Sequence, residues 1–229
     1  MKALLSSTYF GPIQWYQKLN RYDECLIERH ESFIKQTYRN RMLIPTTNGP
    51  LSLTIPTNHN TSLAMKDIRI SDHANWRHVH WNALLSAYGE SPFFEYYQDD
   101  IRPFYEKKYE FLFDFNMEIT EKMIELLDIR PKISVTSEYI QSEELKVKSE
   151  EFNGLANHKV QSSNHKVQCK EVQSIVDFRE AIRPKKPLPD AEFESKRYYQ
   201  VYEQKFGFQP NMSILDLLFN EGNEAIFYL

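Results

Sequence analysis

The chain has 229 residues, a formal net charge of -4 at pH 7, 41% hydrophobic residues and 26% charged residues. These values are typical of a folded globular protein, and the slightly acidic balance provides no overall basic field for nucleic acid. No apolar run reaches 18 residues, and Cys25 and Cys169 have neither metal-site nor disulfide-framework spacing. We therefore expect a cytoplasmic protein with no transmembrane segment, no nucleic-acid partner and no metal.

The N-terminal part of the chain predicts two short strands joined by a helix. Residues 2–7 and 24–28 each contain a three-residue apolar run suited to a buried strand. Gly11-Pro12 interrupts the pattern between them, and residues 13–20 are expected to form a helix that begins after the proline. A strand, a helix and a strand in so few residues favour a parallel pair with a right-handed crossover.

A hairpin is expected next. Asn48-Gly49 lies between two β-prone runs, 41–46 and 51–56, and Asn-Gly is a favoured tight-turn dipeptide. Residues 68–70 are expected to form another strand, with Ser71 or Asp72 capping the following helix. The remaining expected elements are helices at 75–88, 94–108 (broken at Pro103), 111–127, 197–206 and 212–220, and a closing strand at 133–136.

Residues 141–172 differ from the rest of the chain. They are polar and contain the imperfect repeat Asn-His-Lys-Val-Gln, beginning at 157 and again at 164. Two copies without paired apolar positions are too few for a coiled coil, so we expect a mobile surface insertion. The fold prediction is a single α/β domain over residues 1–229. It has a mixed sheet with a Rossmann-like parallel N-terminal part, one β-hairpin and a helical second half.

The expected turn between the first strand and the first helix is one candidate for a functional site. It contains Tyr9, Gly11 and Gln14. Backbone N–H groups at the start of a helix attract anions, and a glycine allows close approach of a ligand. An ordinary βα connection also uses a small residue at this place, so both interpretations stay open.

A cationic segment follows at residues 35–41. If it is extended, Lys35, Thr37, Arg39 and Arg41 share one face, where they match a phosphate or a carboxylate. The alternative is a solvated strand whose charges protect the edge of a sheet.

An imidazole-bearing segment at residues 72–81 is the third candidate. On a helix, His73, Arg77 and His80 lie along one border of the apolar stripe, whereas His78 points away from them. Two histidines separated by two helical turns do not make a metal site. An imidazole beside an arginine suits acid–base chemistry or anion binding. The alternative is that His80 is a hydrogen-bonded core residue and Arg77 a surface group.

Short motifs distributed over nearly the whole chain outside the insertion carry a family resemblance. They are Ser7–Tyr16, Lys35–Arg41, Leu53–Pro56, Asn75–His78, Pro92–Phe94 and Pro210–Gly222. Together they resemble the WbqC-like protein family. The resemblance implies a setting in the biosynthesis of O-antigen or related lipopolysaccharide and surface polysaccharide, and it supplies no catalytic residue.

These observations predict a group-transfer enzyme, a transferase that uses an activated, phosphate-bearing donor. The cationic segment would hold the donor's anionic part. His73 or His80 would move a proton while Asp72 orients an imidazole, and Tyr9 and Gln14 would shape the mouth of the cleft. The substrate would be a small molecule or carrier-bound, and the sequence identifies no cofactor. The alternative is a non-catalytic scaffold or binding partner in a glycan or acyl-carrier pathway.

Overall fold

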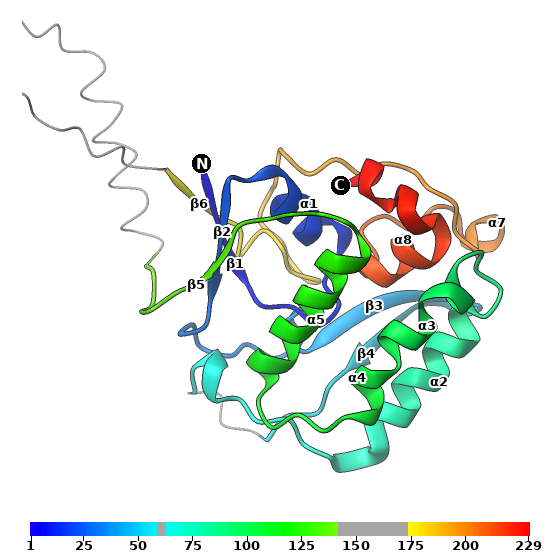
Figure 1. The fold of residues 1–229 in the computed structure, drawn as a ribbon, viewed down its shortest axis with the longest axis horizontal. Helices are drawn as coiled ribbons and strands as arrows, with labels where there is room; N and C mark the ends of the chain where they lie inside the picture. The colour runs from blue at the N-terminus through cyan, green and yellow to red at the C-terminus, as the bar shows by residue number, and fades with distance from the viewer. Residues whose placement is uncertain (59–62, 142–173) are drawn as a thin grey trace, which may run out of the picture.

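The fold was obtained as a computed structural model, which describes residues 1–58, 63–141 and 174–229. Its main sheet has four parallel strands in the order β5-β2-β1-β6 (Figure 1). These strands are β1 (Lys2–Ser6), β2 (Glu24–Glu28), β5 (Ile133–Val135) and β6 (Ile175–Asp177). β1 thus has the next strand of the chain on one side and the last strand on the other.

The βαβ unit expected at the N-terminus is confirmed. Helix α1 (Ile13–Arg21) connects β1 to β2, which pair in parallel with Leu4 opposite Leu26. Alternate strand residues, among them Leu5 and Ile27, are fully buried and belong to the main apolar core. Successive strand residues point to opposite faces of a sheet, so Leu4, which is also fully buried, lies on the face opposite Leu5.

The hairpin is also confirmed. β3 (Arg41–Thr46) pairs antiparallel with β4 (Gly49–Thr54), and Thr46 lies opposite Gly49. Gly49 has a φ of +96°, a backbone conformation that residues with a Cβ rarely adopt. The strand expected at 68–70 is wrong: within the described residues, Arg69 and Ile70 form only isolated bridges, because each meets a separate neighbouring segment.

Helices are the main regular elements among the described residues after the hairpin, as expected. They are α2 (Trp76–Tyr88), α3 (Phe94–Ile101), α4 (Pro103–Glu106), α5 (Leu112–Leu126), α7 (Glu203–Phe206) and α8 (Ile214–Glu221), with 3-10 helices η1 (Met65–Asp67), η2 (His73–Asn75) and η3 (Gly222–Tyr228). Pro103 separates α3 from α4, because it suits the first turn of a new helix. The helix expected at 197–206 is wrong over most of its length, since only α7 is helical.

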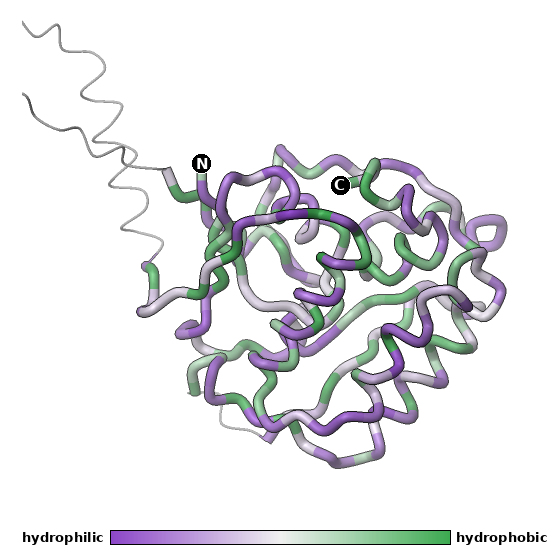
Figure 2. Tube along the Cα trace, viewed as in Figure 1, coloured by the Kyte–Doolittle hydropathy of each residue, from purple (hydrophilic) through white to green (hydrophobic). Residues whose placement is uncertain are grey.

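The hairpin lies in the middle of the molecule. In Figure 1 it runs between α5 and the group formed by α2, α3 and α4, and β3 contacts α2. Figure 2 shows hydrophobic segments along the strands of the parallel sheet and along α8, whereas α2 and α3 alternate between hydrophobic and hydrophilic residues. This alternation indicates that the α2–α4 group presents a polar side to solvent.

Helix α2 begins in an unusual way. Ala74 and Asn75 both have positive φ angles, 64° and 44°, and Asn75 is the residue before the helix. Neither Ser71 nor Asp72 caps α2, because the 3-10 turn η2 intervenes. Left-handed backbone at residues other than glycine costs energy and is found frequently at functional sites.

None of the helices in the described parts of the chain combines the length and the apolar character that a membrane span requires. The polar insertion expected at 141–172 lies, apart from residue 141, outside the described residues.

Candidate functional site

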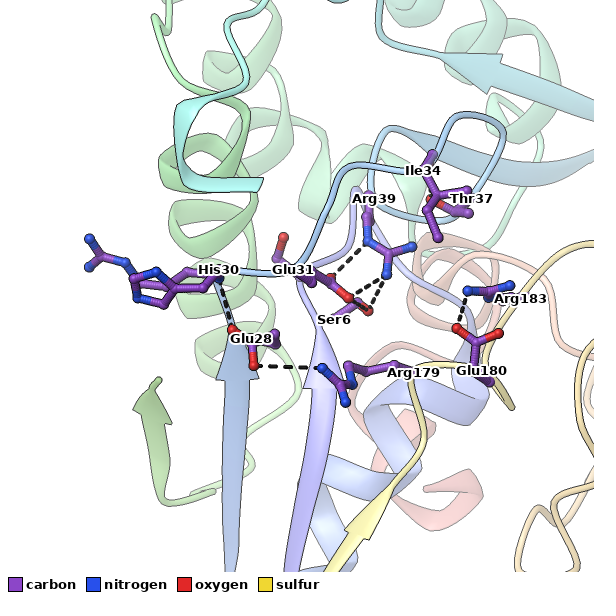
Figure 3. Close-up of polar contacts among 12 residues, drawn as sticks. Ser6, Glu28, His30, Glu31, Ile34, Thr37, Arg39, Arg179, Glu180 and Arg183 are labelled. Atoms are coloured by element: carbon purple, nitrogen blue, oxygen red, sulfur yellow. Dashed lines mark hydrogen bonds and ion pairs between the residues drawn. The ribbon is translucent and has the colours of Figure 1, made fainter. Parts of the chain in front are cut away.

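The carboxyl ends of the parallel strands carry a buried ionic network (Figure 3). Arg39 forms a two-point ion pair with Glu31: Nε donates to Oε1 at 2.8 Å and Nη2 to Oε2 at 2.5 Å. Arg39 Nη2 also donates to Ser6 Oγ at 2.9 Å. The arginine is 3% exposed and the glutamate 5% exposed. Arg39 is therefore already neutralised within the protein.

A second arginine joins this network just after β6. Arg179 donates to both carboxylate oxygens of Asp177, at the end of β6, and its Nη1 lies 3.6 Å from Glu28 Oε2. Glu28 is fully buried, and it accepts further hydrogen bonds from the His30 backbone N–H and from Thr136 Oγ1. Carboxylates and guanidinium groups thus compensate each other at this edge.

In an open parallel sheet, ligands bind outside the carboxyl ends of the strands, where the strand order reverses. Here that place is between β1 and β6. The cavity beside Ser6, Thr8 and Arg39 has a volume of only about 10 Å³, enough for about one water molecule. The protein's own ion pairs fill the rest of this space.

An open hollow lies elsewhere, beside α2 and α4. Its volume is about 460 Å³. It is lined by Asp72, Asn75, Arg77, His78, Trp81, Arg102, Tyr105, Glu106 and Lys108. The lining combines three cations, two carboxylates, an imidazole and two aromatic rings. A concave site with convergent polar groups beside aromatic side chains is typical of small-molecule binding.

Arg77 is the most constrained cation of this hollow. Its Nη1 donates to Asp72 Oδ1 at 2.5 Å, and its guanidinium carbon lies 4.6 Å from the centre of the Trp76 ring. The side chain is 13% exposed, and its Nε and Nη2 are buried without a hydrogen-bond partner in the described parts of the chain. Buried donors of this kind carry an energetic cost that an anionic ligand would relieve.

Asp72 holds two cations of the hollow together. Its Oδ1 accepts from Arg77, and its Oδ2 accepts from Lys108 Nζ at 3.0 Å. The hydrogen bond from Arg77, followed by that from Lys108, lowers the pKa of this carboxyl. Arg102 pairs with Glu106 at 2.6 Å on the α4 side. The hollow therefore has one more cation than carboxylates.

The WbqC-like protein family matches residues 6–228 of the chain. The chain belongs to this family. It is 27% identical over 230 residues to "Uncharacterized protein Rv1507c" of Mycobacterium tuberculosis (strain ATCC 25618 / H37Rv), a match that covers 99% of this chain and 96% of that protein. No solved structure matches it.

The cationic segment of this WbqC-like protein is not extended, so its predicted shared face is wrong. Gln36 has a φ of +60°, and turns replace a strand before β3 begins. Lys35 is exposed, Arg39 is buried against Glu31, and Arg41 donates to Thr54 Oγ1. Arg39 lines the small cavity at the edge of the sheet, and Arg77 lines the α2–α4 hollow. The two arginines therefore do not line the same site.

His80 lies inside the WbqC-like fold. It is 4% exposed, and its Nδ1 is 2.9 Å from the hydroxyl of Tyr9, which is 2.9 Å from the hydroxyl of Tyr105. Burial lowers the pKa of His80 to about 4, against a smaller raising effect of the Thr54 backbone. The structure therefore gives His80 the surroundings of a neutral core histidine, and Tyr9, fully buried, lies behind the hollow's wall.

Three further polar residues lie away from the hollow's lining. His73 is exposed in η2. Gln14 is 6% exposed and donates from Nε2 to Asp190. Asp216, in α8, is a fully buried carboxylate that accepts from Tyr198 and Gln200, and burial raises its pKa to about 6.

Sequence reasoning places Asp72 and Arg77 among the candidates but misses most of the hollow. His78 and Trp81 follow Asn75 at three-residue intervals, which puts them on the same side of α2. This three-residue spacing is the sequence signal that could have identified His78 and Trp81 as site residues. Arg102, Glu106 and Lys108 come from α4 and the residues on either side of it, and no local pattern indicates that α4 packs against α2.

Replacing Arg39 with methionine should destabilise the protein by about 3–5 kcal/mol, because Glu31 would stay buried without its partner. Urea denaturation measures this change in the free energy of unfolding. The control is Lys35→Met at an exposed position nearby, which should change it by less than about 0.5 kcal/mol. Equal stability of the two variants would show that Arg39 is not held as the structure describes.

Acidification should destabilise the protein through His80. Its folded-state pKa of about 4 lies below the ordinary value of about 6.5, so the unfolded chain binds the proton more strongly. The stabilisation is complete above about pH 6.5 and is lost as the pH falls toward 4, by up to about 3 kcal/mol.

Unfolding measurements on wild type, His80→Gln and exposed His73→Gln at several pH values check this prediction. His80→Gln should flatten the acid side of the stability curve, and His73→Gln should leave its slope unchanged. The same acid slope in all three proteins would contradict a neutral, buried His80.

Proposed function

We propose that this WbqC-like protein is a cytoplasmic group-transfer enzyme of surface-polysaccharide or related metabolite assembly. We further propose that the α2–α4 hollow holds the phosphate-bearing part of its activated donor. The observation that carries this proposal is the pair of buried donors on Arg77, at the wall of the hollow, that have no hydrogen-bond partner among the described residues. Family membership associates the chain with surface-polysaccharide assembly, but it does not identify a reaction.

The charges of the hollow favour an anion. Arginine offers forked N–H donors that match two oxygens of a phosphate, and Trp76 and Asp72 restrain the Arg77 side chain before any ligand arrives. Lys108 is 79% exposed, so its flexible ammonium can move toward a ligand. Restraint of Arg77 reduces the conformational entropy that binding would otherwise cost.

The hollow also has groups for the rest of a donor. Trp81 and Tyr105 supply apolar surface, with their ring centres 5.7 Å apart. Asn75 and Glu106 supply an amide and a carboxylate that suit the hydroxyl groups of a sugar. In this proposal Arg77, Arg102 and Lys108 replace the cationic segment as the donor-binding cations, and Asp72 positions two of them.

Arg77→Met should weaken binding of glucose 1-phosphate or UDP-glucose by about 10–100-fold, because it removes a charged hydrogen-bond donor worth about 1.5–3 kcal/mol. Thermal unfolding with and without each compound measures the effect. At ten times its Kd, a bound compound stabilises the wild-type fold by about 1.4 kcal/mol.

The matched control is Arg69→Met, which removes an exposed arginine that pairs with Glu110 and is not part of the hollow's lining. It should bind like wild type. Equal stabilisation of wild type and Arg77→Met by these compounds, or none of either, would remove the donor-binding role of the hollow. Phosphorus NMR of UDP-glucose with added sugar or amine acceptors then separates transfer from binding alone, which would favour the non-catalytic scaffold.

A further inference from the structure

Besides Arg77, the hollow contains an imidazole on the next residue of α2. His78 lies in the first turn of the helix and lines the hollow with Arg77 and Trp81. It is bonded within its own helix: Asn82 Nδ2 lies 2.9 Å from His78 Nε2, one helical turn away. The structure therefore associates this exposed ring both with the hollow and with an exposed side-chain amide of its own helix.

The contact between Asn82 Nδ2 and His78 Nε2 indicates which nitrogen of a neutral imidazole would carry the proton. An amide NH2 group has only donors, so His78 Nε2 accepts the hydrogen bond. A neutral ring whose Nε2 is an acceptor carries its hydrogen on Nδ1. Free histidine favours the opposite tautomer, with the hydrogen on Nε2, so Asn82 would hold His78 in the less common form.

We infer that His78 is a second ligand-binding residue of the α2–α4 hollow, and that Asn82 sets its tautomer so that Nδ1–H is the donor it offers to a phosphate oxygen. The inference rests on the proposed function, because it takes the same phosphate-bearing ligand beside Arg77. It assigns Asn82 as a positioning residue, which acts through His78 and does not contact the ligand.

This arrangement would provide two kinds of donor for one phosphate. Arg77 has a permanent charge, and its Nε and Nη2 groups have no partner within residues 1–58, 63–141 and 174–229. His78 adds an N–H donor whose direction depends on its ring. A site that pairs a permanent cation with a second directed donor selects for an oxyanion with several acceptor oxygens, which a phosphate monoester has and a simple halide lacks.

Nitrogen-15 NMR of the full-length, labelled protein tests the tautomer directly at a pH where imidazole is neutral. Loss of a signal in His78→Gln assigns the ring. Wild type should show His78 protonated on Nδ1, and Asn82→Ala should shift it toward the Nε2–H form. A wild-type ring already protonated on Nε2 would overturn the role of Asn82.

Titration with glucose 1-phosphate tests the contact. The His78 ring signals should shift in wild type and not in Arg77→Met, whereas the exposed His73 ring should stay unchanged and serve as the control. If the compound stabilises the protein in an Arg77-dependent way and His78 does not respond, the inference fails and the proposed function stands. If the compound does not bind through Arg77 at all, the proposed function and the His78 contact both fail.

Discussion

A buried guanidinium group needs acceptors for its N–H donors, and this requirement distinguishes Arg39 from Arg77. Arg39 satisfies it with Glu31 and Ser6 at the carboxyl ends of the parallel strands. Within the described residues, Arg77 satisfies it only in part, through Asp72. The first pattern stabilises the fold, and the second leaves bonding capacity at the wall of a hollow. The functional account follows from this difference.

The position of the hollow is unusual for a parallel sheet. Ligands of such folds ordinarily bind where the strand order reverses, and in this protein the reversal lies between β1 and β6. Ion pairs of Arg39 and of Arg179 occupy that edge and leave a cavity of about 10 Å³. The helical group α2–α4, on the far side of the hairpin, instead provides an open site of about 460 Å³.

The sequence predicts those parts of the fold that local patterns determine. Apolar runs around Leu4 and Leu26 identify β1 and β2, and Asn48-Gly49 identifies the hairpin. β6 has only three residues and forms through pairing with β1, so no periodicity reveals it. The positive φ of Gln36 folds the cationic segment away from a strand, an effect that the order of charges along the chain does not indicate.

The candidate site is predictable to a smaller extent. Asp72 and Arg77 are identifiable because they lie five residues apart in one polar segment. His80 resembles a catalytic residue in the sequence, yet Tyr9, from a loop 71 positions earlier, binds its ring in the core. Lys108 joins Asp72 across 36 positions. Such contacts depend on how elements that are distant in the chain pack together. The order of residues in a single sequence does not reveal that packing.

The arginine Nε–H signals in a nitrogen-15 NMR spectrum test the difference between Arg39 and Arg77 most directly. Each signal is assigned by its loss in the corresponding lysine variant, and inorganic phosphate is then added to the wild-type protein. The account predicts that the Arg77 Nε–H signal moves as phosphate is added while the Arg39 signal stays in place. Movement of the Arg39 signal with no change at Arg77 would contradict it and would place the anion site at the edge of the sheet.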